Sequence, residues 1–179
     1  KAIELDSNYV NAYAVRGLVY DNQQEYAKAI ADYSKAIDLD PNYANAYFNR
    51  GLTYDNLKEY AKAIIDYSKA IDLDPNYANA YNNRGFAYAN QQEYAIAIAD
   101  FSKAIELDPN DAAAYYNRGL AYYNQQEYAQ AIADYNKAIE LDPKFVKAYG
   151  NRGNAYADLK EYAQAIADCS KAIELDPKF

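Results

Sequence analysis

The sequence predicts an all-α solenoid built from antiparallel helix pairs, and three recurring features support this prediction. A glycine returns about every 34 residues, with an arginine directly before it and a tyrosine three residues after it. Prolines recur at the same interval and end one helix in each period. Apolar residues between these markers follow helical spacing, and a period of this length is typical of helix–turn–helix arrays. The glycines are Gly17, Gly51, Gly85, Gly119 and Gly153, and the prolines are Pro41, Pro75, Pro109, Pro143 and Pro177.

This register divides the chain into five full repeats that follow a short remnant. Residues 1–5 closely match residues 35–39, near the end of a repeat, so we expect a fragment of a longer array. Each repeat should hold a first helix of about fourteen residues and a second helix that begins at a Glu-Tyr pair. The predicted ranges are 1–9 for the end of a preceding second helix, then 10–43, 44–77, 78–111, 112–145 and 146–179 for repeats 1 to 5.

Repeat 2 illustrates the predicted elements, with a first helix over residues 44–57 and a second over 59–72. Proline lacks an N–H donor and restricts the residue before it, so each second helix must end near the preceding Leu-Asp pair. The Asn-Gln-Gln stretches at 22–24, 90–92 and 124–126 should form turns within helix pairs. We expect the asparagines after three of the prolines to cap the next first helix, namely Asn42, Asn76 and Asn110.

Helical spacing also assigns the packed faces of repeat 2. Tyr47, Gly51 and Tyr54 share one side of the first helix, where the glycine lets the second helix approach closely. Most of the 23 tyrosines are therefore expected to be structural. Cys169 replaces the aromatic residue of the other repeats, and we interpret it as a small core residue. The facing stripe of the second helix consists of Tyr60, Ile64, Tyr67 and Ile71, with Ala63 and Ala70 as its flat surface.

This combination of aromatic, glycine, alanine and proline positions resembles the tetratricopeptide repeat, and the resemblance covers the whole chain. Departures are mild: tyrosine replaces tryptophan at the first aromatic site, and arginine stands where leucine is common. The resemblance implies a right-handed superhelical solenoid whose first helices line a concave groove. In repeat 2 it rests on Tyr47, Gly51, Tyr54, Ala63, Tyr67, Ala70 and Pro75.

A second stripe on the first helices is not explained by this packing. Its members are separated by four, three and four residues, which places them on one side of each helix. Asparagine inside a helix costs roughly 0.5 kcal/mol relative to good helix formers, so its recurrence is notable. The stripe consists of Asn45, Asn49, Leu52 and Asn56 in repeat 2, Asn79, Asn83, Phe86 and Asn90 in repeat 3, Ala113, Asn117, Leu120 and Asn124 in repeat 4, and Lys147, Asn151, Asn154 and Asp158 in repeat 5.

By resemblance this stripe faces the groove, where a carboxamide can engage both polar groups of a peptide unit. An amide ladder would suit an extended main chain, and it looks like the asparagine ladder in the repeat arm of O-linked N-acetylglucosamine transferase. The alternative interpretation is a solvated polar surface. The ladder would be Asn49, Asn83, Asn117 and Asn151, and the whole predicted groove adds Asn45, Asn79, Phe86, Tyr116, Leu120, Lys147 and Asn154.

Large residues border the predicted ladder, and two interpretations of them stay open. They could anchor apolar side chains of a partner, because aromatic residues carry much of the energy at interfaces. They could equally pack between neighbouring repeats. These residues are Phe48, Phe86, Tyr116, Leu120 and Tyr123.

The carboxylate clamp of some family members, which binds the acidic C-termini of heat-shock chaperones, does not match this chain. Its asparagine and one lysine map to Asn117 and Lys147, but its other three positions hold Asn82, Phe86 and Asn151. One positive charge is too few to hold two carboxylates. We therefore do not expect that ligand.

Other charged residues are interpreted as structural or solvated. The arginines before the glycines should pair with an acidic group on a neighbouring helix instead of forming a phosphate-binding row. Lys35, Asp32 and Asp38 are interpreted as solvated spacing pairs on a second helix.

Composition narrows the function classes. The formal net charge of −8 argues against nucleic acid and against an anionic membrane surface as partners. The chain has no histidine and one cysteine, so no nucleophile, metal or cofactor constellation is visible, and we predict neither an enzyme nor a cofactor. A single cysteine also fits a reducing, cytoplasmic location.

The leading hypothesis is a protein-interaction scaffold that binds an extended peptide segment in its groove. Two alternatives remain. One is a structural solenoid that associates end to end through uncapped terminal repeats. The other is the substrate-recruiting arm of a larger enzyme.

Overall fold

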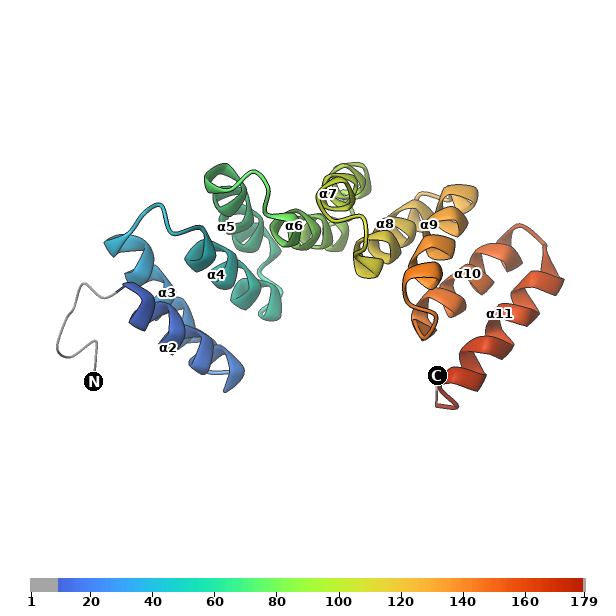
Figure 1. Ribbon diagram of the computed structural model, residues 1–179, viewed down its shortest axis with the longest axis horizontal. Helices are drawn as coiled ribbons and strands as arrows, with labels where there is room; N and C mark the ends of the chain where they lie inside the picture. The colour runs from blue at the N-terminus through green and yellow to red at the C-terminus, as the bar shows by residue number, and fades with distance from the viewer. Residues whose placement is uncertain (1–9, 179) are drawn as a thin grey trace. The chain divides into compact units, whose positions relative to one another are not determined.

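The computed structural model describes residues 10–178, and these form α-helices joined by short turns, without a strand (Figure 1). The predicted end of a preceding second helix, residues 1–9, lies outside the described residues. The first helices of the repeats are α2 (Val10–Asn22), α4 (Ala44–Asn56), α6 (Ala78–Asn90), α8 (Ala112–Asn124) and α10 (Val146–Asp158). The second helices are α3 (Tyr26–Leu39), α5 (Tyr60–Leu73), α7 (Tyr94–Leu107), α9 (Tyr128–Leu141) and α11 (Tyr162–Leu175).

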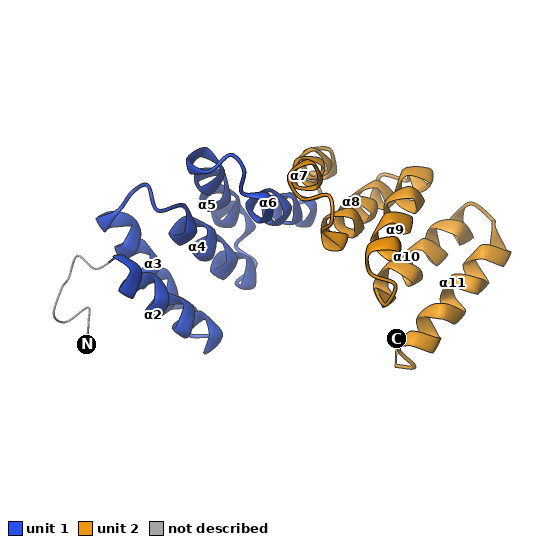
Figure 2. Ribbon diagram, viewed as in Figure 1, with its two compact units in different colours: residues 1–91 blue, residues 92–179 orange. Residues whose placement is uncertain are grey.

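The helices belong to two compact units, which Figure 2 shows in different colours. Unit 1 covers residues 1–91 and contains α2 to α6, whereas unit 2 covers residues 92–179 and contains α7 to α11. Within unit 1 each helix packs on the next one in the chain, and the same holds within unit 2. Packing between sequence neighbours is the arrangement expected of an all-α repeat solenoid.

The close approach of paired helices is confirmed at the glycine positions. The ring of Tyr67 in α5 packs against Gly51 of α4, and a Cβ atom on this glycine would lie 2.7 Å from Cε1 of the ring. Ala63 is fully buried in α5, and Ala46 and Ala70 are fully buried in the clusters that join repeat 2 to its neighbours. A small residue on one helix therefore makes room for a large ring from the other.

The capping prediction is wrong. The N-cap of α4 is Tyr43, whose side chain makes no cap hydrogen bond, and Asn42 lies before it. Instead, the carboxylate of Asp40 accepts a hydrogen bond from the Asn42 amide at 3.0 Å. Asp40, the residue before the proline, thus forms an Asx-type turn with Asn42, and the asparagine side chain does not cap the helix. The side-chain cap that does form is at α8, where Asp111 accepts from the Ala113 amide at 2.8 Å.

The interpretation of Cys169 as a core residue is also wrong, because this cysteine is exposed. Its equivalent in repeat 2, Tyr67, is buried under Phe48 of the preceding helix. Repeat 5 has Gly150 in place of that phenylalanine, so no side chain of α10 covers the cysteine from this position. None of the described helices is long and apolar enough to cross a membrane.

Candidate functional site

The arginine before each glycine is a structural residue, as predicted. In repeat 2, Arg50 donates two hydrogen bonds to Asp66 at 2.7 and 2.8 Å and a third to the Ser34 hydroxyl at 2.8 Å. The guanidinium therefore joins α4 to its own second helix and to the second helix of the preceding repeat. Asp66 is 3% exposed, so removing its partner would leave a buried unpaired charge.

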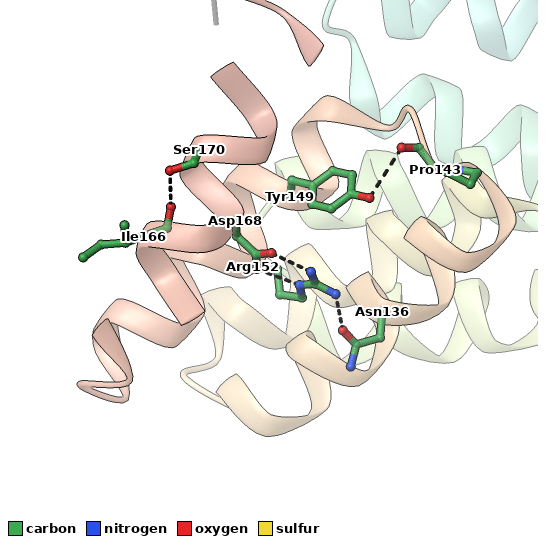
Figure 3. Close-up of polar contacts among 7 residues, drawn as sticks. All are labelled: Asn136, Pro143, Tyr149, Arg152, Ile166, Asp168 and Ser170. Carbon is green, nitrogen blue, oxygen red and sulfur yellow. Dashed lines mark hydrogen bonds and ion pairs between the residues drawn. The ribbon is translucent and has the colours of Figure 1, made fainter. Parts of the chain in front are cut away.

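Figure 3 shows the same junction in repeat 5. Arg152 donates to the carboxylate of Asp168 at 2.7 and 2.5 Å and to the side-chain oxygen of Asn136 at 2.5 Å. Asn136 takes the place that serine has in the other repeats. The donors of this guanidinium are directed into the fold, which removes it as an anion-binding candidate.

One acidic residue differs from its predicted role. Asp32 is buried, at 6% exposure, and accepts two hydrogen bonds from Arg16 at 2.6 and 2.7 Å. It was expected to be solvated beside Lys35, and only the lysine of this pair is exposed. The recurrence of aspartate sixteen residues after each arginine is the signal that could have revealed this pair.

Within each unit, the first helices lie against one another. In unit 1, α2 contacts α4 and α4 contacts α6, whereas the described second helices α3 and α5 do not meet. In unit 2, α8 contacts α10, and α9 does not meet α11. Helices that approach more closely lie on the inner side of a curved stack, so the first helices form the inner face of each unit.

Two carboxamides of the predicted stripe in unit 1 make no hydrogen bond among the described residues. They belong to Asn49 of α4 and Asn83 of α6, and both side chains are half-buried. Two other members are engaged: Asn45 accepts from the Tyr77 hydroxyl at 3.0 Å, and Asn90 donates to the carbonyl of its own helix at residue 86, at 2.9 Å. Asn79 is exposed. The stripe thus contains both satisfied and unsatisfied amides.

An apolar row runs beside the amides in unit 1. Phe86 is 44% exposed, Leu52 is half-buried, and Leu18 of α2 is 47% exposed at the same register. Val15, which is 63% exposed, stands where Asn49 and Asn83 stand in the next repeats. Sequence reasoning did not extend the stripe into repeat 1, although the shared register would have identified these two residues.

The large residues beside the ladder mostly pack between helices. The ring centroid of Phe48 lies 5.8 Å from that of Tyr67 and 4.7 Å from that of Tyr77, the residue directly before α6. Tyr116 in unit 2 has the same position, at 5.9 Å from Tyr135 and 4.9 Å from Phe145. Phe48 and Tyr116 therefore pack between helices, as the second of the two interpretations predicts, whereas Phe86 remains exposed.

The predicted stripe of unit 2 also contains residues in different environments. Asn151 donates its amide hydrogen to the Tyr116 hydroxyl at 2.9 Å. Lys147 and Asn154 are exposed, whereas Asn117 and Leu120 are half-buried. Burial raises the pKa of Tyr116 above its ordinary value, so the phenol remains a neutral partner for Asn151.

The acids that precede the turn, on the inner side of unit 1, have structural partners. Asp55 accepts a hydrogen bond from the Tyr67 hydroxyl at 2.9 Å, and burial raises the pKa of its carboxyl group to about 6. Asp21 accepts from the Thr53 hydroxyl at 2.8 Å, which links repeats 1 and 2. Among residues 10–178 no cluster of three potential metal ligands occurs.

Comparison with protein families identifies this architecture. The tetratricopeptide repeat model matches residues 44–77, 78–111, 112–145 and 146–179, and a second TPR repeat model matches residues 22–58. The chain therefore belongs to the tetratricopeptide repeat family, whose fold is typical of protein-interaction scaffolds. No curated protein matches the chain significantly.

Solved structures resemble the chain over almost its whole length. The MamA protein is 31% identical, with a TM-score of 0.86 over 94% of this chain and 92% of that one. YrrB, a TPR protein with an unusual peptide-binding site, is 26% identical, with a TM-score of 0.82 over 99% of this chain and 91% of that one. Pseudomonas aeruginosa pilF shares the fold at 23% identity, with a TM-score of 0.83 over 92% of this chain and 75% of that one.

Proposed function

We propose that this chain is a protein-interaction scaffold whose first-helix stripe binds an extended peptide segment in each unit. The observation that carries the proposal is the pair of unpartnered carboxamides, Asn49 and Asn83, on adjoining helices of unit 1. Each carboxamide offers one acceptor and two donors, which matches the C=O and N–H groups of a peptide unit. An extended chain leaves those groups available because it has no internal hydrogen bonds.

Selectivity for the bound segment would come from the apolar row beside these amides. Leu18, Leu52 and Phe86 present apolar surface at one register of three successive first helices. Amides that hold the main chain do not read side chains, whereas an apolar row favours ligands that bury apolar groups against it. The combined surface therefore suits an extended segment with apolar side chains on one edge.

Unit 2 would bind its own segment with a related set of residues. Asn151 keeps its amide oxygen as an acceptor while its NH₂ group holds Tyr116, and Asn154 and Lys147 are exposed beside it. Asn117 and Leu120 complete the stripe on α8. The net charge of −8 favours a neutral or cationic protein or peptide over an acidic one.

The test is peptide selection from a random library with the full chain, followed by affinity measurement on a synthetic peptide by fluorescence anisotropy. The Asn49→Ala/Asn83→Ala variant should lose about tenfold or more in affinity, since two hydrogen bonds of about 1 kcal/mol each disappear. Its circular dichroism should be unchanged. Asn90→Ala is the matched control, because that amide already bonds its own helix. Equal affinity of all three proteins would reject the proposal.

A second candidate function is self-association through α11. Tyr162, Ile166 and Ile173 are 61%, 68% and 57% exposed on this helix. Exposed apolar side chains grouped on one helix face are characteristic of interaction surfaces. Sedimentation velocity should then show a concentration-dependent dimer that Ile166→Lys removes, and a monomer at all concentrations would reject this candidate.

A further inference from the structure

Repeats 2 and 4 each place two aromatic rings at one position between paired helices. In repeat 2 these are Phe48 of α4 and Tyr67 of α5, with centroids 5.8 Å apart. In repeat 4 they are Tyr116 of α8 and Tyr135 of α9, with centroids 5.9 Å apart. The first ring of each pair lies next to the asparagine ladder position in the sequence. The pair of rings is a feature of repeats 2 and 4, since repeats 1 and 3 have Ala14 and Asn82 at the position of the first ring.

Repeat 5 lacks both rings. Its first helix has Gly150 at the position of Phe48, and its second helix has Cys169 at the position of Tyr67. The result is a cavity of about 250 Å³ between α10 and α11. The cavity is lined by Gly150, Asn151, Asn154, Cys169, Ala172 and Ile173.

The lining combines apolar walls with two amides from the stripe. Ala172 and Ile173 provide the walls, the Cys169 sulfur is a polarizable contact for an aromatic ring, and no charged side chain takes part. Asn151 and Asn154 belong to the proposed peptide-binding stripe, so the cavity is continuous with it. A neutral planar side chain that also carries a main chain fits this arrangement better than an acid, a metal ion or a free anion.

The glycine beneath the missing ring is retained. A Cβ atom on Gly153 would lie 3.1 Å from the sulfur of Cys169, whereas at Gly51 it would lie 2.7 Å from a ring carbon of Tyr67. Repeat 5 therefore keeps the small residue on which a ring packs in repeat 2, but among the described residues the sulfur of Cys169, and no ring, lies against it.

We propose that this cavity in unit 2 binds an aromatic side chain of the partner segment, which replaces the missing internal ring. The inference rests on the proposed peptide-binding function and adds the chemistry of one side chain. The main chain of the segment would lie along Asn151 and Asn154, and its phenylalanine or tyrosine would enter between Gly150 and Cys169. A partner segment for unit 2 therefore contains an aromatic residue.

Cys169 is the only cysteine in the chain and provides a reporter inside the cavity. The experiment measures its alkylation rate by iodoacetamide in the presence of N-acetyl-L-tyrosinamide at millimolar concentration. We expect at least a threefold slower reaction, and no slowing with N-acetyl-L-alaninamide. Absence of protection, or equal protection by both amides, would overturn the inference.

Filling the cavity supplies the matched control. Gly150→Phe keeps the reporter but restores one ring of the pair, so N-acetyl-L-tyrosinamide should no longer protect Cys169. Gln164→Ala changes an exposed residue of α11 that lines neither this cavity nor the adjoining pocket shared by Ile166 and Cys169, so protection should persist. Protection that survives in a folded Gly150→Phe protein would contradict the assignment. If this variant does not fold, Cys169→Tyr tests the same point through peptide affinity, because it rebuilds the contact seen at Gly51.

A peptide that contains one aromatic residue separates failure of the inference from failure of the proposed function. Its replacement by alanine should weaken binding at least fivefold in the native chain and have no effect in Cys169→Tyr. If the amide variants of unit 1 weaken their ligand but this replacement has no effect, only the cavity inference fails. If Cys169 is protected but no amide variant weakens any ligand, the cavity remains and the peptide-binding stripe fails.

Discussion

The buried tyrosine of the second helix has a carboxylate partner in repeat 2, whereas in repeat 4 it has no hydrogen-bond partner among the described residues. Tyr67 of α5 donates its hydroxyl to Asp55 at 2.9 Å. Tyr135 of α9 is equally buried, but its hydroxyl makes no hydrogen bond among the described residues. The position of Asp55 is taken by Tyr123 in repeat 4, whose own hydroxyl donates to Asp158 at 2.7 Å.

This difference separates the packing of the ring on a glycine from the hydrogen bond of the hydroxyl, which occur together at Tyr67. Both rings lie on a glycine, at 2.7 and 2.8 Å from a Cβ built on Gly51 and Gly119, so the ring contact alone is sufficient to bury the residue. In repeat 2 the Asp55 carboxylate provides a hydrogen-bond partner in addition to the ring contact. This carboxylate also lowers stability, because one of its oxygens remains buried and unpaired. The contact between ring and glycine is therefore common to both repeats, whereas the hydrogen-bond partner of the tyrosine hydroxyl differs between them.

The largest effect is expected from adding a methyl group beneath the ring in repeat 2. Gly51→Ala should lower the free energy of unfolding by about 2 to 3 kcal/mol, because the rigid Tyr67 ring must move. Gly153→Ala should cost about 1 kcal/mol or less, since its nearest contact is the sulfur of Cys169 at 3.1 Å. Urea denaturation measures both, and equal losses would contradict the ring-contact explanation.

The second largest loss of stability is expected from removing the Tyr67 hydroxyl, which donates a hydrogen bond to Asp55. Tyr67→Phe should destabilise the protein by about 1 to 2 kcal/mol at neutral pH, because the carboxylate loses its remaining partner. Thermal unfolding followed by circular dichroism is a suitable measurement. An unchanged melting temperature would mean that water replaces the phenol at no cost.

Asp55 predicts a specific pH dependence. Burial raises the pKa of its carboxyl group to about 6, so the folded protein retains a proton that the unfolded chain has lost. Its contribution to stability is therefore greatest below about pH 4 and is lost as the pH rises to about 6. Asp55→Asn should equal the native chain below pH 4 and exceed it by about 1 kcal/mol at pH 7, a figure reduced for the solvent contact that Asp55 retains.

The difference in unfolding free energy between these two proteins, measured from pH 3.5 to 7.5, isolates this residue from the other carboxylates. A difference that does not change with pH would exclude titration of Asp55 as its cause.

The smallest effect is expected at the unpartnered hydroxyl of unit 2. Tyr135→Phe should be neutral or stabilise the protein by up to about 1 kcal/mol, because it removes a buried polar group without a partner. Urea denaturation of this variant beside Tyr67→Phe gives opposite or clearly unequal changes if the comparison is correct. A similar loss in both would indicate that the Tyr135 hydroxyl has a partner in solution.

The fold was predictable because its determinants recur. Gly51, Tyr67 and the prolines repeat at one period, and each copy reinforces the same interpretation. The paired arginines were predictable for the same reason, although their partner Asp32 was not recognised. The caps were missed because Asp40 and Asn42 are both good capping residues by type, and only the backbone path decides which one is used.

The candidate site was predictable as a stripe but not residue by residue. Asn45 and Asn49 are the same residue type on the same helix face, and they are distinguished by the hydroxyl of Tyr77, which lies at the end of repeat 2 directly before α6. Cys169 was misread because the sequence register places it in the helix pair without showing that Gly150 leaves it uncovered. Contacts between repeats depend on side-chain reach, which periodicity does not report.

The central claim is that Asn49 and Asn83 hold the main chain of a ligand, and a backbone substitution in the ligand tests it most directly. A selected peptide is made with single amide-to-ester replacements, each of which removes one N–H donor, and its affinity is measured for the native chain and for Asn49→Ala/Asn83→Ala. The account predicts one or two positions at which the ester weakens native binding about fivefold or more but leaves binding to the variant unchanged. Equal losses in both proteins at every position would contradict it.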